Sequence, residues 1–388
     1  MGRPVTWTGR AATGLVLAVA ATLSASCAKL GPSVPAVSGA APAAGAGSPA
    51  GSASPAATGG PAVRHVSAAG QAATAQLGVQ IYWHEVTDAY AVKANADRLF
   101  DYAVGLGANS VGISFPIYTD GATPTKVYTK AGVTPTPSSL GTLIGEAKAR
   151  DLRVMVRPII DEANIKDKAG AWRGSIKPPD KAAWFASYQK ALAPFLTAAQ
   201  GAHADEFVIG SELDSLVGQT PRWRALESAA AAVFHGRLAY ADNWGQWATG
   251  RPGVPGADPA MDAYPQLHLA DSATVSQITA AWSAWLRKRP AGLTDTVVQE
   301  VGIAATLGAY QQPAVWGTKR QKLAPQIQTH WFAGACAAVK SLHMSGIYFW
   351  NLDAWAEPAK AATYDAGSFI GRGDAAIKAC FATGWPGQ

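Results

Sequence analysis

The sequence has few of the features that mark several common protein classes. Its 388 residues include three cysteines, and charged residues make up 15% of the chain. No run of lysine and arginine is interleaved with aromatic residues, which argues against nucleic-acid binding. Neither GxGxxG nor GxxxxGKS/T occurs, so the usual phosphate-cradling loops are missing. The seven histidines contain no HExxH pair, and we expect neither a metal nor another cofactor.

The N-terminal region lacks an apolar stretch long enough to span a bilayer. Residues 11–23 are apolar, follow Arg3 and Arg10, and precede small residues, as in an export signal over 1–26. A membrane-anchoring helix is the alternative. Residues 27–72 are mostly Ala, Gly, Ser and Pro and contain almost no large apolar side chain, which predicts a disordered linker. We expect one folded domain over 73–388.

The three cysteines raise two questions. Cys27 follows LSAS, which resembles a bacterial lipoprotein signal, although Leu23 lies four positions before the cysteine and the usual leucine lies three before it. Cys27 is therefore a lipidation candidate, and the protein is expected either outside the cell or anchored to the outer face of its membrane. Contact with the membrane is expected only through this lipid. Cys336 and Cys380 form an even pair that either bonds as a disulfide or stays as two buried thiols.

The pattern of the remaining chain predicts alternating strands and helices. Stretches with helical spacing, such as 89–106, 182–199 and 326–342, separate short apolar runs. This alternation favours a parallel sheet, and the repeat of eight units favours a closed (β/α)8 TIM barrel over an open doubly wound sheet. We expect a monomer. The apolar runs are 78–83, 109–115, 152–160, 206–210, 237–242, 260–265, 296–300 and 346–350.

Two glutamates stand at the ends of these runs. Glu212 follows the fourth run and Glu300 ends the seventh. In a barrel of parallel strands the carboxyl ends of the strands form the active face, so these carboxylates should meet there. Glycoside hydrolysis needs such a pair, one protonated to assist the leaving oxygen and one ionised to attack the anomeric carbon. Trp and Tyr near the strand ends suit the apolar faces of sugar rings.

The same residues carry a family resemblance. The stretches AWRGSIKPPDKAAWFASYQKAL (171–192) and DEFVIGSELDSL (205–216), with VQEVG (298–302), resemble glycoside hydrolase family 113. Known members of this family of retaining barrel enzymes in clan A include β-mannanases. The resemblance implies that Glu212 is the acid/base and Glu300 is the nucleophile. Ser211 stands where many clan members have Asn, which leaves either Ser211 or Asn243 to hold the sugar 2-hydroxyl.

Several other residues are candidates for substrate binding. Arg157 either orients the nucleophile or forms a structural ion pair with Asp161 or Glu162. Each remaining candidate either contacts the substrate or belongs to ordinary barrel or loop packing, and Tyr264 could also donate a hydrogen bond to the nucleophile. These candidates are Trp83, Trp172, Arg173, Asn243, Trp244, Tyr264 and Trp350.

The sequence thus predicts a retaining hydrolase of β-linked polysaccharides or oligosaccharides, with mannan-type chains as the first substrate to test. Two other classes have almost the same residues. One is a carbohydrate-binding lipoprotein of the cell envelope without turnover, and the other is a transglycosylase on the same barrel. Sugar identity, linkage, and endo or exo action depend on loops, for which composition gives no information.

Overall fold

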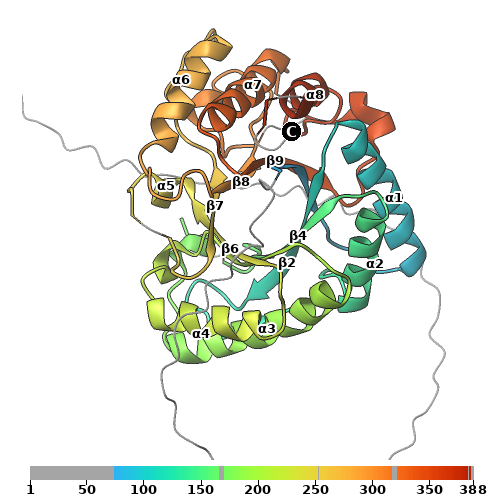
Figure 1. The fold of residues 1–388 in the computed structure, drawn as a ribbon, viewed down its shortest axis with the longest axis vertical. Helices are drawn as coiled ribbons and strands as arrows, with labels where there is room; N and C mark the ends of the chain where they lie inside the picture. The colour runs from blue at the N-terminus through green and yellow to red at the C-terminus, as the bar shows by residue number, and fades with distance from the viewer. Residues whose placement is uncertain (1–73, 166–169, 252, 317–320, 383, 386–388) are drawn as a thin grey trace, which may run out of the picture. The chain divides into compact units, whose positions relative to one another are not determined.

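Eight parallel strands form a closed ring at the centre of the protein, with helices around it (Figure 1). The first strand, β1, pairs with β2 on one side and with the last strand, β9, on the other, and this pairing closes the barrel. The computed structural model describes residues 74–165, 170–251, 253–316, 321–382 and 384–385. The predicted (β/α)8 TIM barrel is confirmed, whereas the predicted signal (1–26), the linker (27–72) and Cys27 lie outside the described residues.

The described elements alternate along the chain, apart from the short β3, which pairs antiparallel with β2. The strands are β1 (Gln76–Tyr82), β2 (Ser110–Thr119), β3 (Val127–Tyr128), β4 (Arg153–Ile160), β5 (Glu206–Ser211), β6 (Arg237–Asn243), β7 (Asp258–Ala263), β8 (Val297–Val301) and β9 (Gly346–Asp353). The helices are α1 (Ala89–Gly105), α2 (Pro137–Lys148), α3 (Lys181–Gly201), α4 (Thr220–Ala231), α5 (Trp244–Trp247), α6 (Val275–Leu286), α7 (Pro325–Ser341) and α8 (Asp374–Ala382).

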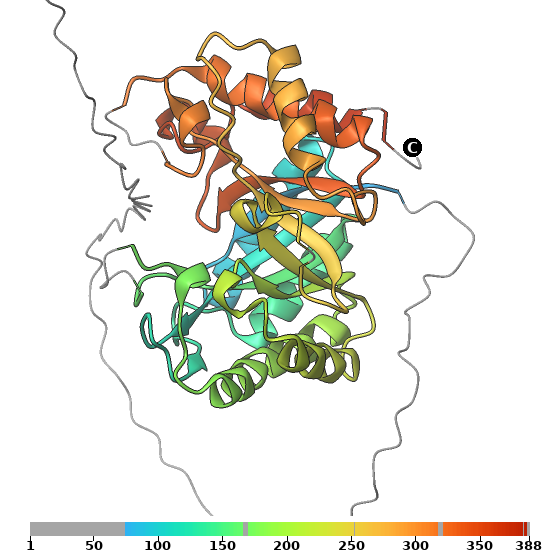
Figure 2. The same ribbon diagram turned by 90° about the vertical axis from the view of Figure 1, so that its left-hand side faces the viewer.

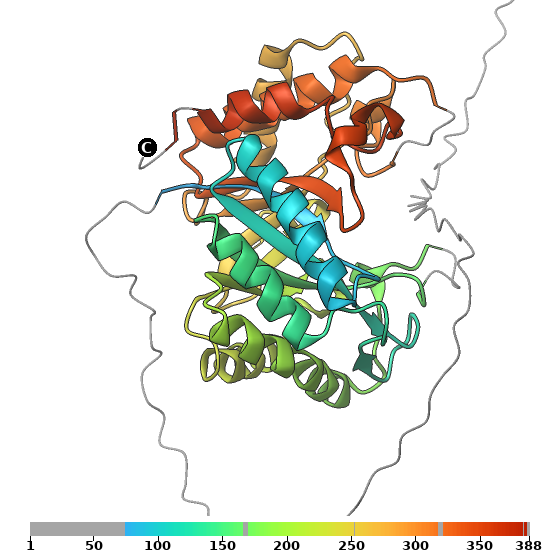
Figure 3. The ribbon, with the colours of Figure 1, turned by 90° about the vertical axis from the view of Figure 1, so that its right-hand side faces the viewer.

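Side-chain caps fix where several of these helices begin. The Asp88 carboxylate accepts from the Ala91 N–H at 2.9 Å before α1, and the Asp180 carboxylate accepts from the Ala183 N–H at 3.0 Å before α3. Such caps satisfy backbone donors that have no partner inside the helix. The outer helices then cover the strands, with α1 and α2 along one flank (Figure 3) and α3 and α4 below α6 and α7 (Figure 2).

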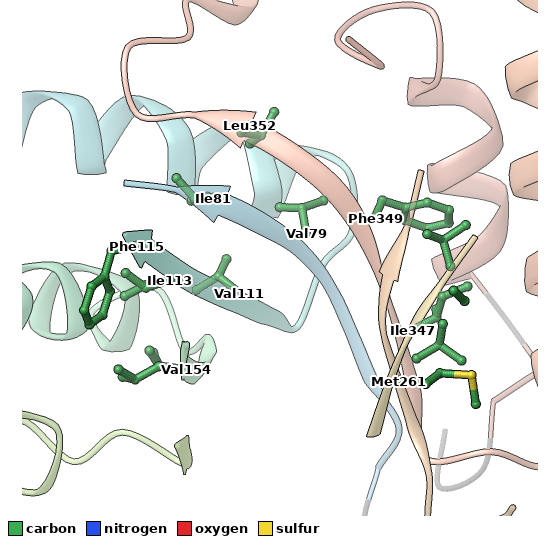
Figure 4. Close-up of a cluster of buried hydrophobic side chains, with 14 of the residues drawn as sticks. Val79, Ile81, Val111, Ile113, Phe115, Val154, Met261, Ile347, Phe349 and Leu352 are labelled. Carbon is green, nitrogen blue, oxygen red and sulfur yellow. The ribbon is translucent and has the colours of Figure 1, made fainter. Parts of the chain in front are cut away.

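Alternation along the strands divides the core into two layers. On β1, Val79 and Ile81 point outward and pack, with apolar residues of the neighbouring strands, against the helices (Figure 4). The barrel interior holds a smaller apolar cluster that includes Met155 and Val208, together with polar residues such as Gln80. The Gln80 amide donates to the Gln299 carbonyl at 3.0 Å, so this buried polar group is satisfied.

A disulfide joins Cys336 in α7 to Cys380 in α8, with Cα atoms 5.8 Å apart. It connects the last helix to its neighbour across 44 positions of sequence. Among the described residues, no helix combines the length and the apolar character needed to cross a membrane.

Candidate active site

Glu212 lies directly after β5, on a backbone that turns sharply. Its φ is 56°, in the left-handed region that residues with a side chain rarely adopt. Its N–H donates to the Ala241 carbonyl at 2.9 Å, which fixes this turn against β6. Glu212 is 5% exposed, and its carboxylate accepts from Arg173 and from the Asn243 amide, each at 2.7 Å. Strained backbone of this kind is concentrated at functional sites.

Glu300 lies within β8 and is 6% exposed. One carboxylate oxygen accepts from Arg157 at 2.5 Å, and the other accepts from the Tyr264 hydroxyl at 2.5 Å. Burial, followed by the charge of Glu300, raises the pKa of Tyr264 well above its ordinary value, so the hydroxyl keeps its proton and stays a donor. Both oxygens of Glu300 are thereby held in a fixed orientation.

Arg157 links two strands through its guanidinium. This fully buried side chain of β4 pairs with Glu300 and also with Asp262 of β7. Its partners are therefore not Asp161 or Glu162, which were the structural alternatives, and its place beside Glu300 agrees with the orienting role. Asp262 is a site residue that the sequence analysis missed, because its inward direction depends on the register between β7 and β8.

The two glutamates share one electrostatic environment. Burial raises the pKa of Glu212, Arg173 opposes this shift, and the negative charge of Glu300 raises the pKa further. Burial likewise raises the pKa of Asp262, which Arg157 opposes and Glu300 reinforces. Like charges held close in a buried site favour protonation of one partner. This arrangement favours a protonated Glu212 beside Glu300, whose two oxygens accept from Arg157 and Tyr264.

Arg173 reaches the site from the loop after β4. It lies in the short 3₁₀ turn Arg173–Ser175, where its Nε donates to the Ile160 carbonyl at 2.9 Å. The guanidinium also lies 3.5 Å from Glu162, so it stands between Glu162 and Glu212. The prediction placed Arg173 at the substrate, whereas its described contacts are with protein groups of the site.

Trp172 stabilises the same loop. Its backbone N–H donates to the Ser175 hydroxyl at 2.9 Å, and its ring lies over Gly174. A Cβ atom on Gly174 would lie 2.3 Å from the indole, so only glycine permits this approach. The half-buried ring keeps part of its surface open, and a substrate contact for Trp172 stays a prediction.

A group of aromatic rings packs against Arg157 and Tyr264, the two partners of Glu300. Trp350 is half-buried at the end region of β9, with its ring 5.6 Å from the Arg157 guanidinium carbon. Trp244 and Trp316, both half-buried, each contact Tyr264 edge-on, with ring centroids 5.5 and 5.8 Å away. The sequence analysis missed Trp316, because this residue lies in the long loop after the seventh predicted run and no nearby motif marks it.

Trp83 requires a correction. It was predicted to bind substrate, yet its side chain is 1% exposed and its indole N–H donates to the Val86 carbonyl at 3.3 Å. The ring therefore belongs to the core. Five further tryptophans are equally buried, which shows that much of the aromatic content serves packing: Trp184, Trp223, Trp247, Trp282 and Trp331.

Asn243 and Ser211 were the two candidates for the sugar 2-hydroxyl. The Asn243 amide nitrogen donates to Glu212, and its oxygen accepts from the Gly245 N–H at 2.7 Å at the start of α5. The Ser211 hydroxyl is buried and has no hydrogen-bond partner among the described residues. The part of the chain that the structure describes contains no group of three or more His, Cys, Asp or Glu side chains that could hold a metal ion.

A (β/α)8 barrel with a buried pair of glutamates at the carboxyl ends of its strands fits the class of glycoside hydrolases. The family model of Glycoside Hydrolase Family 113 matches residues 80–370. The chain therefore belongs to this family, and it is a glycoside hydrolase.

Several solved structures share the fold of this chain. A GH113 β-1,4-mannanase structure is 18% identical, with a TM-score of 0.67, and the match covers 80% of this chain and 99% of that chain. The GH113 β-mannanase AaManA from Alicyclobacillus acidocaldarius, in complex with ManMIm, is 18% identical, with a TM-score of 0.64 and coverage of 80% and 97%. An endo-1,4-β-D-mannanase from Thermotoga petrophila is 11% identical, with a TM-score of 0.52 and coverage of 79% and 98%. A comparison with curated proteins gives no match.

Proposed function

We propose that this glycoside hydrolase cleaves β-1,4-linked mannan chains with retention of configuration. The observation that carries the mechanism is the buried pair of Glu212 and Glu300, each held by its own arginine. The choice of mannan is supported by the family and by the three β-mannanase structures described above, which share its fold.

In the first step, Glu300 attacks the anomeric carbon while protonated Glu212 donates its proton to the departing glycosidic oxygen. The C–O bond to the leaving sugar breaks as the ester bond to Glu300 forms. Glu300 loses its negative charge in this ester, but Arg157 keeps a carboxylate partner in Asp262. Asp262 thus prevents the guanidinium from becoming an unpaired buried charge during the reaction.

In the second step, ionised Glu212 removes a proton from a water molecule, which attacks the anomeric carbon and releases Glu300. Arg173 and Asn243 fix the direction of the Glu212 carboxylate throughout. Trp350 lies close enough to Arg157 to form a wall for the sugar at the cleavage point. We assign Arg157, Asp262, Tyr264, Arg173 and Asn243 positioning roles.

The decisive experiment incubates the purified protein with a panel of β-linked glycans and measures new reducing ends. Mannan should yield reducing ends, and proton NMR should show the β-anomer of the product first. Glu300→Gln serves as the inactive control. Release from other glycans but not from mannan would overturn the substrate assignment, and initial formation of the α-anomer would overturn the mechanism. Binding to mannan without any release would instead indicate a carbohydrate-binding protein.

We further propose that the protein is exported and either secreted or anchored through a lipid on Cys27. The support is the composition of residues 1–26 and the lipoprotein-like LSASC sequence. Fractionation of producing cells tests this by comparing the native chain with Cys27→Ser. Membrane association that the substitution abolishes indicates the lipid anchor, and recovery of both proteins in the medium indicates secretion. Recovery of both from the cytoplasm would overturn the proposal.

A further inference from the structure

A surface pocket lies beyond β9, in the segment that leads to α8. We call it the rim pocket, and its volume is about 280 Å³, close to the lower end of the range for small-molecule sites, roughly 300 Å³. Trp355 is 49% exposed there, which is unusual for so large an aromatic ring. The rim pocket is lined by Trp355, Glu357, Lys360, Thr363, Tyr364 and Asp365.

The lining of the rim pocket favours an uncharged ligand with hydroxyl groups. Glu357 and Lys360 form an exposed ion pair, and a second carboxylate comes from Asp365. A hydrocarbon would have to desolvate this pair, and an anion would face two carboxylates against one ammonium. A sugar ring, in contrast, can stack its apolar face on Trp355 and bind its hydroxyls to the charged and hydroxyl side chains around it.

Contacts connect the rim pocket to the catalytic carboxylates without a break. From Trp350, beside Arg157, the Tyr82 ring lies 6.0 Å away, and the His84 ring follows 5.4 Å beyond it. The His84 Nε2 contacts Asp353 at 2.8 Å, and the other oxygen of Asp353 accepts from the backbone N–H of Trp355 at 2.8 Å. Because Trp355 follows the carboxyl end of β9, the pocket belongs to the same face of the barrel as the site.

We propose that the rim pocket is a remote glycan subsite, which holds a sugar unit of a long substrate on the part of the chain that stays attached to Glu300. In the ring of eight strands, β9 is four positions from β5, so the pocket lies across the barrel from Glu212. The departing sugar must be within reach of Glu212, which donates its proton. The retained part of the chain then extends toward the opposite side. This inference rests on the proposed function.

The test compares kcat/KM for β-1,4-mannooligosaccharides of increasing length. In Trp355→Ala, the ratio of kcat/KM for the longest to the shortest cleaved substrate should fall about tenfold, the loss expected when one aromatic binding contact is removed. Trp355→Phe keeps an aromatic face and should restore most of that ratio. Val104→Ala is the matched control, because Val104 is 45% exposed at the end of α1 remote from the mouth and should leave the ratio unchanged.

Oligosaccharides labelled at the reducing end add a second readout. The wild-type protein should release short labelled fragments, because the rim pocket fixes the unlabelled part of the chain, and Trp355→Ala should shift the cleavage position. An unchanged ratio and an unchanged cleavage pattern in Trp355→Ala would overturn the subsite while leaving the hydrolase intact. If the wild-type protein cleaves none of these substrates, the proposed function itself fails.

Discussion

The strand β5 has a buried glutamate at each end, and the two differ in what surrounds them. Glu206 begins the strand, is 2% exposed, and accepts from the amides of Gln76 at 2.9 Å and Gln299 at 2.8 Å. Glu212 follows the strand and accepts from a guanidinium and from the amide of Asn243. Burial raises the pKa of both carboxyl groups.

What separates the two ends is therefore not burial but the arrangement of charge. Glu212 interacts electrostatically with a second carboxylate, that of Glu300, and each of the two carboxylates is paired with an arginine. Glu206 is fixed mainly by neutral amides, with Arg237 3.9 Å away. A buried carboxylate becomes suited to catalysis when a second, differently held carboxylate shares its environment.

Removal of the two mouth carboxylates is expected to have the largest effect. Glu212→Gln should lower kcat by about a hundred- to ten-thousandfold on mannan, and Glu300→Gln by at least as much. Glu206→Gln, at the other end of the strand, should retain activity within about threefold, since it lies outside the charged cluster. An aryl mannoside with a good leaving group should restore the first step in Glu212→Gln but not in Glu300→Gln. Equal losses at Glu206 and Glu212 would contradict the comparison.

Replacement of Arg157 should cost the most stability. Arg157→Met leaves Glu300 and Asp262 buried without their cation, so the free energy of unfolding should fall by about 3–5 kcal/mol. Urea unfolding at neutral pH measures this change. The double variant Arg157→Met with Asp262→Asn should recover part of the loss, because it leaves one fewer uncompensated charge. No recovery would indicate that the loss comes from packing alone.

The amide environment of Glu206 predicts a smaller loss of stability on substitution than the loss expected at Arg157. Gln76 is fixed by the Tyr348 hydroxyl, which donates to its oxygen at 2.7 Å, whereas the Gln299 side-chain oxygen has no partner among the described residues. Glu206→Gln can therefore keep both hydrogen bonds if the Gln299 amide reverses. Glu206→Leu leaves both amide donors without an acceptor and should lower the free energy of unfolding by about 1–3 kcal/mol.

Glu206 also makes the free energy of unfolding depend on pH, and the sign of this dependence can be predicted. The folded-state pKa of Glu206 is raised by burial, so the folded protein binds the proton more tightly than the unfolded chain. Its contribution to stability is lost as the pH rises from the ordinary glutamate pKa through the raised value. Glu206→Gln lacks this loss, and its free energy of unfolding relative to wild type should increase from pH 4 to pH 8. A decrease over this interval would refute the assignment.

The smallest expected effect is a shift in the pH dependence of kcat/KM when Arg173 is replaced. This cation lowers the pKa of Glu212, so Arg173→Met should raise that pKa. Because the proposed first step needs Glu212 in its protonated form, the alkaline limb of kcat/KM against pH should move to higher pH. Arg173→Lys keeps the positive charge and should shift the limb less. A shift to lower pH would show that another group controls this limb.

The strands and the two glutamates could be predicted because they depend on local patterns. Apolar runs mark the eight barrel strands, and the carboxyl end of a parallel strand has a known place in the fold. The contact of Arg157 with Glu300 was one of the two alternatives from the sequence, but its second partner, Asp262, could not be predicted, since that pair depends on how β4 and β7 are placed around the barrel interior. Trp83 and Trp350 each end an apolar run in the sequence, so the pattern does not distinguish them. In the structure Trp83 is buried in the core, whereas Trp350 is half-buried.

The turn at Glu212 also has a consequence for the stability of the fold. A backbone with φ of 56° suits glycine, and a side chain there costs roughly 1 kcal/mol. We expect Glu212→Gly to abolish turnover and to relax the strain in this turn. A position whose backbone suits glycine is thus occupied by the glutamate that we propose as the acid of the reaction.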